Sequence, residues 1–249
     1  MFSQSPYRVR MEWGARGARE AAERGDIVIV VDVLSFSSTV VTAVSHGVLV
    51  HPYPMKDGAQ AYADRIGAEL VSGRAEAAVS GGPTLSPVSF GPQHRGRRYD
   101  LCSLNGAACC WLANEAPALF AGCLLNASAV ADTANQLQAA TGAAVTVVPC
   151  GEQWQGARDG ENRLRPAVED YLGAGAIIRG LAGDKSPEAE VCEAAFRASE
   201  PRLVTLLQDC GSGRELRERG FEADVLHCSR LDAFNCAPLL GADGFFTAT

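Results

Sequence analysis

Residues 26–41 are the stretch that most constrains what this chain can fold into. Residues 27–31 form a continuous apolar run rich in β-branched side chains, which is typical of a strand covered by helices on both faces. Asp32 ends this run. Four hydroxyl-bearing residues then lead into apolar residues at helical spacing: Ser35, Ser37, Ser38 and Thr39. The stretch therefore predicts a buried strand, a short turn and a helix.

The predicted turn is also a candidate ligand site. In open α/β sheets, ligands bind beyond the carboxyl ends of the strands, and the free N–H groups at a helix N-terminus attract anions. A carboxylate beside that terminus suits a hard cation that shares the site with a phosphate. A purely structural role fits the same residues, because Asp32 would cap the turn and Ser37 or Ser38 would be the N-cap of the helix.

The composition narrows the class of protein. The 249 residues suffice for one large α/β domain or two small ones, with 47% hydrophobic and 20% charged residues. The net charge of −7 argues against nucleic acid as a partner, and no apolar run approaches the roughly 18 residues of a membrane span. No apolar signal segment is evident, and nine cysteines, an odd count, indicate reduced thiols in a cytoplasmic protein. The sequence is compatible with a homodimer.

Strands and helices alternate along most of the chain, which predicts crossover connections and a largely parallel sheet. Besides the strand at 27–31, we expect strands at 47–53, 68–71, 99–103, 118–125, 143–149, 224–227 and 244–247. Besides the helix that follows Asp32, we expect helices at 15–24, 57–66, 107–114, 129–140, 165–181, 187–198 and 202–210, and a short one from 211. Residues 72–98 form a long irregular segment. The predicted fold is one α/β unit over residues 1–249, with a mainly parallel or mixed sheet covered by helices in three layers. It is compatible with two similar halves, about 1–115 and 116–249.

Polar residues follow four of the predicted strands: Asp32, Ser103 with Asn105, Asn126 with Ser128, and Cys150 with Glu152. If the strands run parallel, these groups meet at one edge of the sheet, although caps and turns explain some of them. Glu169 and Asp170 are adjacent on the helix predicted at 165–181. Because neighbours on a helix point in different directions, we expect at most one of them to reach a shared site.

Six short motifs, taken in order, resemble the family of magnesium-dependent 2-phosphosulfolactate phosphatases over most of the chain. They are residues 31–39 (VDVLSFSST), 102–108 (CSLNGAA), 123–131 (CLLNASAVA), 149–152 (PCGE), 169–175 (EDYLGAG) and 213–216 (GREL). The resemblance implies a phosphatase that uses Mg²⁺ as its cofactor. Its substrate would be a small acidic phosphomonoester, 2-phosphosulfolactate or a related phosphorylated hydroxy acid.

On this resemblance, Asp32 and Glu152 are the candidate catalytic residues. Asp32, with an acid from Glu152, Glu169 or Asp170, would bind Mg²⁺, and the ion would bridge a phosphate oxygen and orient the attacking water. The substrate and its remaining phosphate oxygens would be held by Ser35, Ser37, Ser38, Thr39, Ser103, Asn105, Gly106, Asn126, Ser128 and Arg214.

The chain departs from the family pattern where charge matters. Ser35 stands where the family has arginine, Ala108 where it usually has a second arginine, and Gly73-Arg74 where Gly-Glu is usual. Arginine is the natural partner of phosphate, sulfonate and carboxylate groups, so these changes leave the exact substrate open unless Arg74 or the basic residues at 95–98 replace the charge. The alternative function is a non-catalytic anion-binding or assembly homologue of the same fold.

Overall fold

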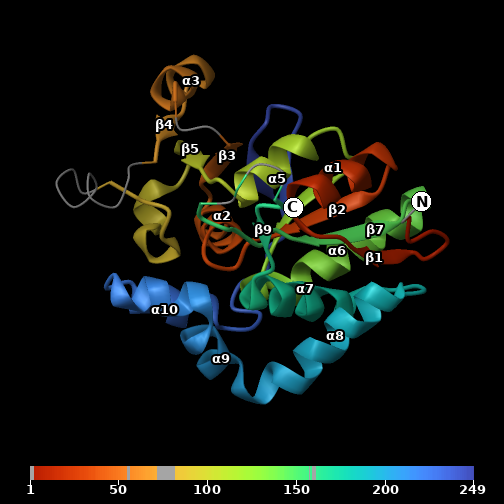
Figure 1. Cartoon of the computed structure of the whole chain (residues 1–249). Helices are drawn as coiled ribbons and strands as arrows, with labels where there is room; N and C mark the ends of the chain where they lie inside the picture. Colours follow the sequence, from red (N-terminus) through yellow and green to blue (C-terminus); the bar gives the residue numbers. More distant parts are fainter. Residues whose placement is uncertain (1–2, 55–56, 72–81, 157, 159–160) are drawn as a thin grey trace.

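The computed structural model of the chain describes residues 3–54, 57–71, 82–156, 158 and 161–249. These residues form a nine-stranded sheet, a separate two-stranded hairpin and helices on both faces of the sheet (Figure 1). The strands of the sheet are β1 (Val9–Met11), β2 (Ile27–Val31), β3 (Leu49–Tyr53), β4 (Glu69–Leu70), β5 (Arg98–Cys102), β6 (Leu119–Gly122), β7 (Val145–Pro149), β10 (Pro238–Leu240) and β11 (Phe246–Ala248). The hairpin consists of β8 (Glu152–Gln153) and β9 (Leu164–Arg165).

Helices are found along most of the described part of the chain. They are α1 (Gly14–Glu23), α2 (Phe36–Ser45), α3 (Ala59–Ile66), α5 (Gly106–Leu112), α6 (Ala127–Thr141), α7 (Val168–Gly180), α8 (Pro187–Ser199), α9 (Leu203–Asp209), α10 (Gly211–Glu218) and α11 (Glu222–Cys228). In that part of the chain, no helix combines the length and the apolar character that crossing a membrane requires.

The strands fall into two parallel blocks that an antiparallel hairpin joins. The order across the sheet is β1-β7-β2-β6-β10-β11-β3-β5-β4. β1, β7, β2 and β6 pair in parallel, and so do β3, β5 and β4. Between the blocks, β10 and β11 pair antiparallel with each other. β10 also pairs antiparallel with β6 of the first block, and β11 with β3 of the second. The sheet is therefore mixed, in agreement with the predicted three-layer α/β fold.

The predicted halves do not coincide with these blocks. The first block takes β1 and β2 from before residue 115 and β6 and β7 from after it. The strand order does not test whether the two parts, about 1–115 and 116–249, are similar to each other, so the two halves stay a prediction.

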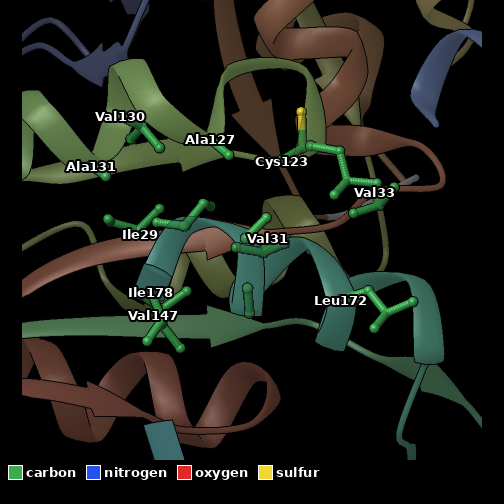
Figure 2. Close-up of a cluster of buried hydrophobic side chains, with 14 of the residues drawn as sticks. Ile29, Val31, Val33, Cys123, Ala127, Val130, Ala131, Val147, Leu172 and Ile178 are labelled. Carbon is green, nitrogen blue, oxygen red and sulfur yellow. The ribbon is translucent and has the colours of Figure 1, made fainter. Parts of the chain in front are cut away.

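Strand β2 lies at the centre of the core, as its unbroken apolar run predicted. Ile29 and Val31 pack among side chains of α6 and α7 on one face of the sheet (Figure 2). Val28 and Val30 point to the opposite face, where they join a second cluster with residues of α1, α2 and α5. Because a strand turns alternate side chains to opposite faces, only a continuous apolar run satisfies both layers.

Three sequence predictions about elements were wrong. Residues 224–227 lie in helix α11 and not in a strand, and the burial of Val225 and Cys228 follows a helical spacing. The strand predicted at 118–125 ends at Gly122, because the Asn126 side chain accepts a hydrogen bond from the Cys123 N–H and turns the chain into a short 3₁₀ helix. Residues 9–11, where we expected no strand, form β1, whose Arg10 is paired with Asp26.

Candidate active site

Asp32 joins the N-termini of two helices. It follows β2, and its Oδ1 accepts a hydrogen bond from the N–H of Phe36, the first residue of α2, at 3.0 Å. Its Oδ2 accepts one from the N–H of Gly106, the first residue of α5, also at 3.0 Å. Helix N-termini favour negative charge. Asp32 therefore does cap the turn, but it caps two elements from distant parts of the chain.

The charge of Asp32 is nevertheless costly. The pKa of this carboxyl is raised to about 7, chiefly by burial and next by the nearby carboxylate of Glu152, while the N–H groups of Phe36 and Gly106 lower it. Glu169 adds to the increase. Within the described ranges, Asp32 forms no ion pair. A carboxylate with this pKa gains free energy from any cation that reaches it.

Asp170 ties together the turns after two neighbouring strands. Its Oδ1 accepts a hydrogen bond from the N–H of Val33 at 2.7 Å, and its Oδ2 accepts one from the N–H of Gly151 at 2.9 Å. Burial, followed by the charges of Asp32 and Glu169, raises the pKa of Asp170 well above its usual value. Because each oxygen already holds a main-chain group, Asp170 positions the turns that carry Asp32 and Glu152.

Glu152 contacts the loop that follows β5. The Asn105 side-chain amide donates to Glu152 Oε2 at 2.8 Å, and Ser103 Oγ accepts from the N–H groups of Asn105 and Gly106 at 3.3 and 3.2 Å. Burial raises the pKa of Glu152, against the effect of the Asn105 hydrogen bond, and Glu169 raises it further. These contacts show that the carboxyl ends of β2, β5 and β7 converge, although β5 belongs to the other block.

Glu169 completes a group of four acids, the carboxylate cluster: Asp32, Glu152, Glu169 and Asp170. Glu169 is only 2% exposed, and its charge raises the pKa of each of the other three acids. The expectation that at most one of Glu169 and Asp170 reaches the site was wrong. Both residues are buried in the first turn of α7. Asp170 holds two main-chain N–H groups, and Glu169 lies close enough to the other acids to raise their pKa values.

The cluster suits a hard cation by its chemistry. Carboxylate oxygens are the ligands that Mg²⁺ prefers, and Mg²⁺ needs only one or two of them because it keeps several waters. No trio of metal ligands is already arranged among the described residues. Asp32 and Asp170 each accept a main-chain N–H group at both oxygens, so each can offer a metal only its remaining lone pairs. One oxygen of Glu152, in contrast, forms no hydrogen bond with the described residues.

Several residues predicted to bind phosphate instead support the fold. The hydroxyls of Ser37, Ser38 and Thr39 donate to the carbonyls of Val30, Val33 and Ser35, and all three residues are fully buried. Their side chains hold the β2–α2 turn together. The expected N-cap role of Ser37 or Ser38 was wrong, because both lie inside α2 and Ser35 is its N-cap residue.

The other predicted binding residues take three different positions. Asn126 is buried and hydrogen-bonded to the main chain of Cys123, Ala121 and Cys236, and Ser128 is bonded to Asp232. Neither forms a hydrogen bond with the carboxylate cluster among the described residues. Because β6 pairs in parallel with β2, its carboxyl end does lie at the same edge of the sheet as Asp32, as expected. Arg214 is exposed on α10. Ser35 is the N-cap residue of α2, and its hydroxyl forms no hydrogen bond within the described ranges.

The basic residues proposed as replacements for the family arginines lie elsewhere. Arg97 pairs with Glu69, and Arg98 lies over the Phe245 ring at the start of β5, the opposite end from the carboxylate cluster. Arg74 falls outside the described residues.

Arg165 was missed by sequence reasoning. It was assigned to the start of a helix, but it lies in β9 and pairs across the hairpin with Glu152. Pro166 was the signal, because the residue before a proline is driven out of the helical region.

A cavity of about 1010 Å³ adjoins the site. It lies between α1, α5 and the β8–β9 hairpin, and it reaches the carboxylate cluster at Glu152, next to Asn105. Asp32 and Glu169 are not part of its wall.

Fold and site together define an α/β protein with a carboxylate-rich site at converging strand ends. A family model described as 2-phosphosulpholactate phosphatase matches residues 16–243. The chain therefore belongs to the 2-phosphosulfolactate phosphatase family.

Individual relatives match over similar lengths. The probable 2-phosphosulfolactate phosphatase of Carboxydothermus hydrogenoformans is 30% identical over 219 residues, which cover 85% of this chain and 84% of the relative. Those of Pseudothermotoga lettingae and Gloeobacter violaceus are 28% and 27% identical, covering 91% and 88% of this chain and 94% and 90% of the relatives.

Proposed function

We propose that the protein is a magnesium-dependent phosphatase that hydrolyses 2-phosphosulfolactate or a closely related phosphorylated hydroxy acid. The observation that carries this proposal is the carboxylate cluster. Its four acids meet at converging strand ends, three of them with raised pKa values, and none forms an ion pair within the described ranges. The family of the chain, and the printed names of its relatives, support the reaction and the substrate.

Asp32 and Glu169 are the residues that would hold Mg²⁺, which leaves Glu152 free for a second role. When bound, the ion would neutralise charge on the phosphate and favour ionisation of a nearby water. The protein contributes rigidity: Asp32 is fixed by the N–H groups of two helices, and Asp170 fixes the turns on either side. Such fixed geometry is the main protein contribution to phosphoryl transfer.

Glu152 is the best candidate for accepting a proton from the attacking water. Asn105 binds one of its oxygens, while the other forms no hydrogen bond among the described residues. Its raised pKa brings it closer to neutrality, where a general base works best.

Phosphate release from 2-phosphosulfolactate, measured with Mg²⁺ and then with EDTA, tests the proposal. We expect turnover that depends on Mg²⁺. Turnover that persists in EDTA would refute the metal requirement. Binding of 2-phosphosulfolactate without turnover would favour the alternative, a non-catalytic anion-binding homologue, which the serine and alanine at positions 35 and 108 favour.

A further inference from the structure

Among the described residues, Arg165 has no anionic partner, and it lies beside acids that have no cationic partner. The residue is half-buried, and its guanidinium forms no hydrogen bond or ion pair with any residue that the structure describes. Its guanidinium lies over the ring of Trp154, whose centroid is 5.4 Å from Arg165 Cζ. A guanidinium has five N–H donors, and removing them partly from water without a partner costs free energy.

The hairpin places Arg165 directly opposite Glu152. The two residues are cross-strand partners in β8 and β9, so their side chains lie on the same face of the hairpin. They are close enough for Arg165 to lower the pKa of Glu152, although burial has the larger, opposite effect. They form no ion pair, and Asn105 holds one Glu152 oxygen instead. The guanidinium therefore stays available at the edge of the carboxylate cluster.

The first turn of α10 lies on the other side of Arg165. A Cβ atom placed on Gly211 would be 2.9 Å from Arg165 Nη2. Gly211 and Ser212 are the first two residues of this eight-residue helix, so their N–H groups have no acceptor within it. Burial and then the Glu169 carboxylate raise the pKa of the Cys210 thiol to about 12, which places this helix end beside the cluster. Ser212 is buried, and its hydroxyl forms no hydrogen bond with the described residues.

We propose that Arg165, with the first turn of α10 beside it, binds the second acidic group of the substrate while the carboxylate cluster and its cation hold the phosphate. This inference rests on the proposed function. A substrate of that class carries a carboxylate or sulfonate near its phosphate, and a planar guanidinium binds such a group through two parallel hydrogen bonds. Arg165 would supply the recognition that the serine and alanine at positions 35 and 108 cannot.

Two variants test the inference by different routes. Arg165→Gln removes the charge, and we expect the KM for 2-phosphosulfolactate to rise at least about tenfold, with a smaller change in kcat. Gly211→Ala keeps the charge but places a methyl group against Nη2, so KM should rise by a smaller factor. Arg65→Gln is the matched control, because Arg65 is an exposed arginine outside the cavity wall that lies over an aromatic ring, that of Tyr62. For isopropyl phosphate, which lacks a second acid, Arg165→Gln should change KM less than it does for 2-phosphosulfolactate.

Calorimetry provides a readout that does not require turnover. In the presence of Mg²⁺, sulfolactate, the dephosphorylated product, should bind the wild type and the Arg65→Gln control more tightly than Arg165→Gln by about the same factor. Lactate and isethionate, which keep only the carboxylate or only the sulfonate, identify which group Arg165 holds. Circular dichroism and thermal unfolding establish that each variant is folded.

The outcomes separate the two proposals. Turnover with an unchanged KM in Arg165→Gln would overturn the role of Arg165 and leave the phosphatase function intact. Sulfolactate binding that depends on Arg165, without turnover of any phosphomonoester, would support the role of Arg165 and overturn the phosphatase function. Wild-type protein that neither binds sulfolactate nor releases phosphate would overturn both.

Discussion

At the scale of single residues, the carboxylate cluster combines structural and chemical roles. Asp32 caps two helices, yet burial and the charge of Glu152 raise its pKa to about 7. Asp170 likewise ties two turns together at a raised pKa. The capping and functional interpretations of Asp32 are therefore not alternatives, because the same N–H groups that it caps hold its carboxylate in place.

The raised pKa of Asp32 predicts a pH-dependent stability of the metal-free protein. The folded carboxyl keeps its proton up to about pH 7, whereas an aspartate in the unfolded chain has its ordinary pKa of 3.8. This stabilising contribution is fully present below pH 3.8 and is lost as the pH rises through 7. In EDTA, we expect the thermal midpoint of the wild type to fall more between pH 5 and pH 8 than that of Asp32→Asn. Equal falls in the two proteins would show that Asp32 does not titrate in this window.

At the scale of elements, the sequence predicted those parts of the site whose signals are local. The apolar run before Asp32 predicted β2, and the polar residues after the strands led to Asn105 and Glu152. Arg165 was missed because Pro166 was included in a helix. Asp170 was named as a candidate metal ligand, but its role in tying two turns together was not predicted, because its partners, Val33 and Gly151, are brought to it only by tertiary packing. Contacts of this kind leave no periodic pattern in a sequence.

The junction of α2 and α5 depends on a residue without a side chain. A Cβ atom on Gly106 would lie 2.7 Å from Phe36 Cβ, and Phe36 is fully buried. We expect Gly106→Ala to destabilise the protein by about 1–3 kcal/mol and to reduce activity, because the N–H that holds Asp32 must shift. Thermal unfolding measures the first effect and phosphate release the second. Addition of Phe36→Leu should restore part of the loss, and a double variant no better than Gly106→Ala would contradict the steric explanation.

At the scale of the whole molecule, the β10–β11 hairpin joins two parallel blocks that the sequence did not distinguish. β11 contacts β3 through the pair Phe246 and Val50, and both residues are fully buried. The sequence predicted strand–helix alternation, but it could not show that the chain returns to the centre of the sheet at its end. The pairing of distant segments depends on the assembled core.

This arrangement predicts a large effect from one side chain near the end of the chain. Phe246→Ala should lower the free energy of unfolding by about 3–5 kcal/mol, because it leaves a cavity between the blocks. Thr247→Ala, at the exposed neighbouring position, is the control and should change it by less than about 0.5 kcal/mol. Similar unfolding curves for both variants would show that the hairpin is not essential to the junction.

Calorimetric titration of Mg²⁺ into the wild type and into Asp32→Asn tests the central claim most directly. Asparagine keeps the size of the side chain and one carbonyl acceptor but removes the charge. We expect the variant to fold with an unchanged circular dichroism spectrum, and to lose Mg²⁺ affinity by at least about tenfold together with Mg²⁺-dependent phosphate release. A folded Asp32→Asn protein that binds Mg²⁺ as tightly as the wild type would contradict the assignment of the carboxylate cluster as the metal site.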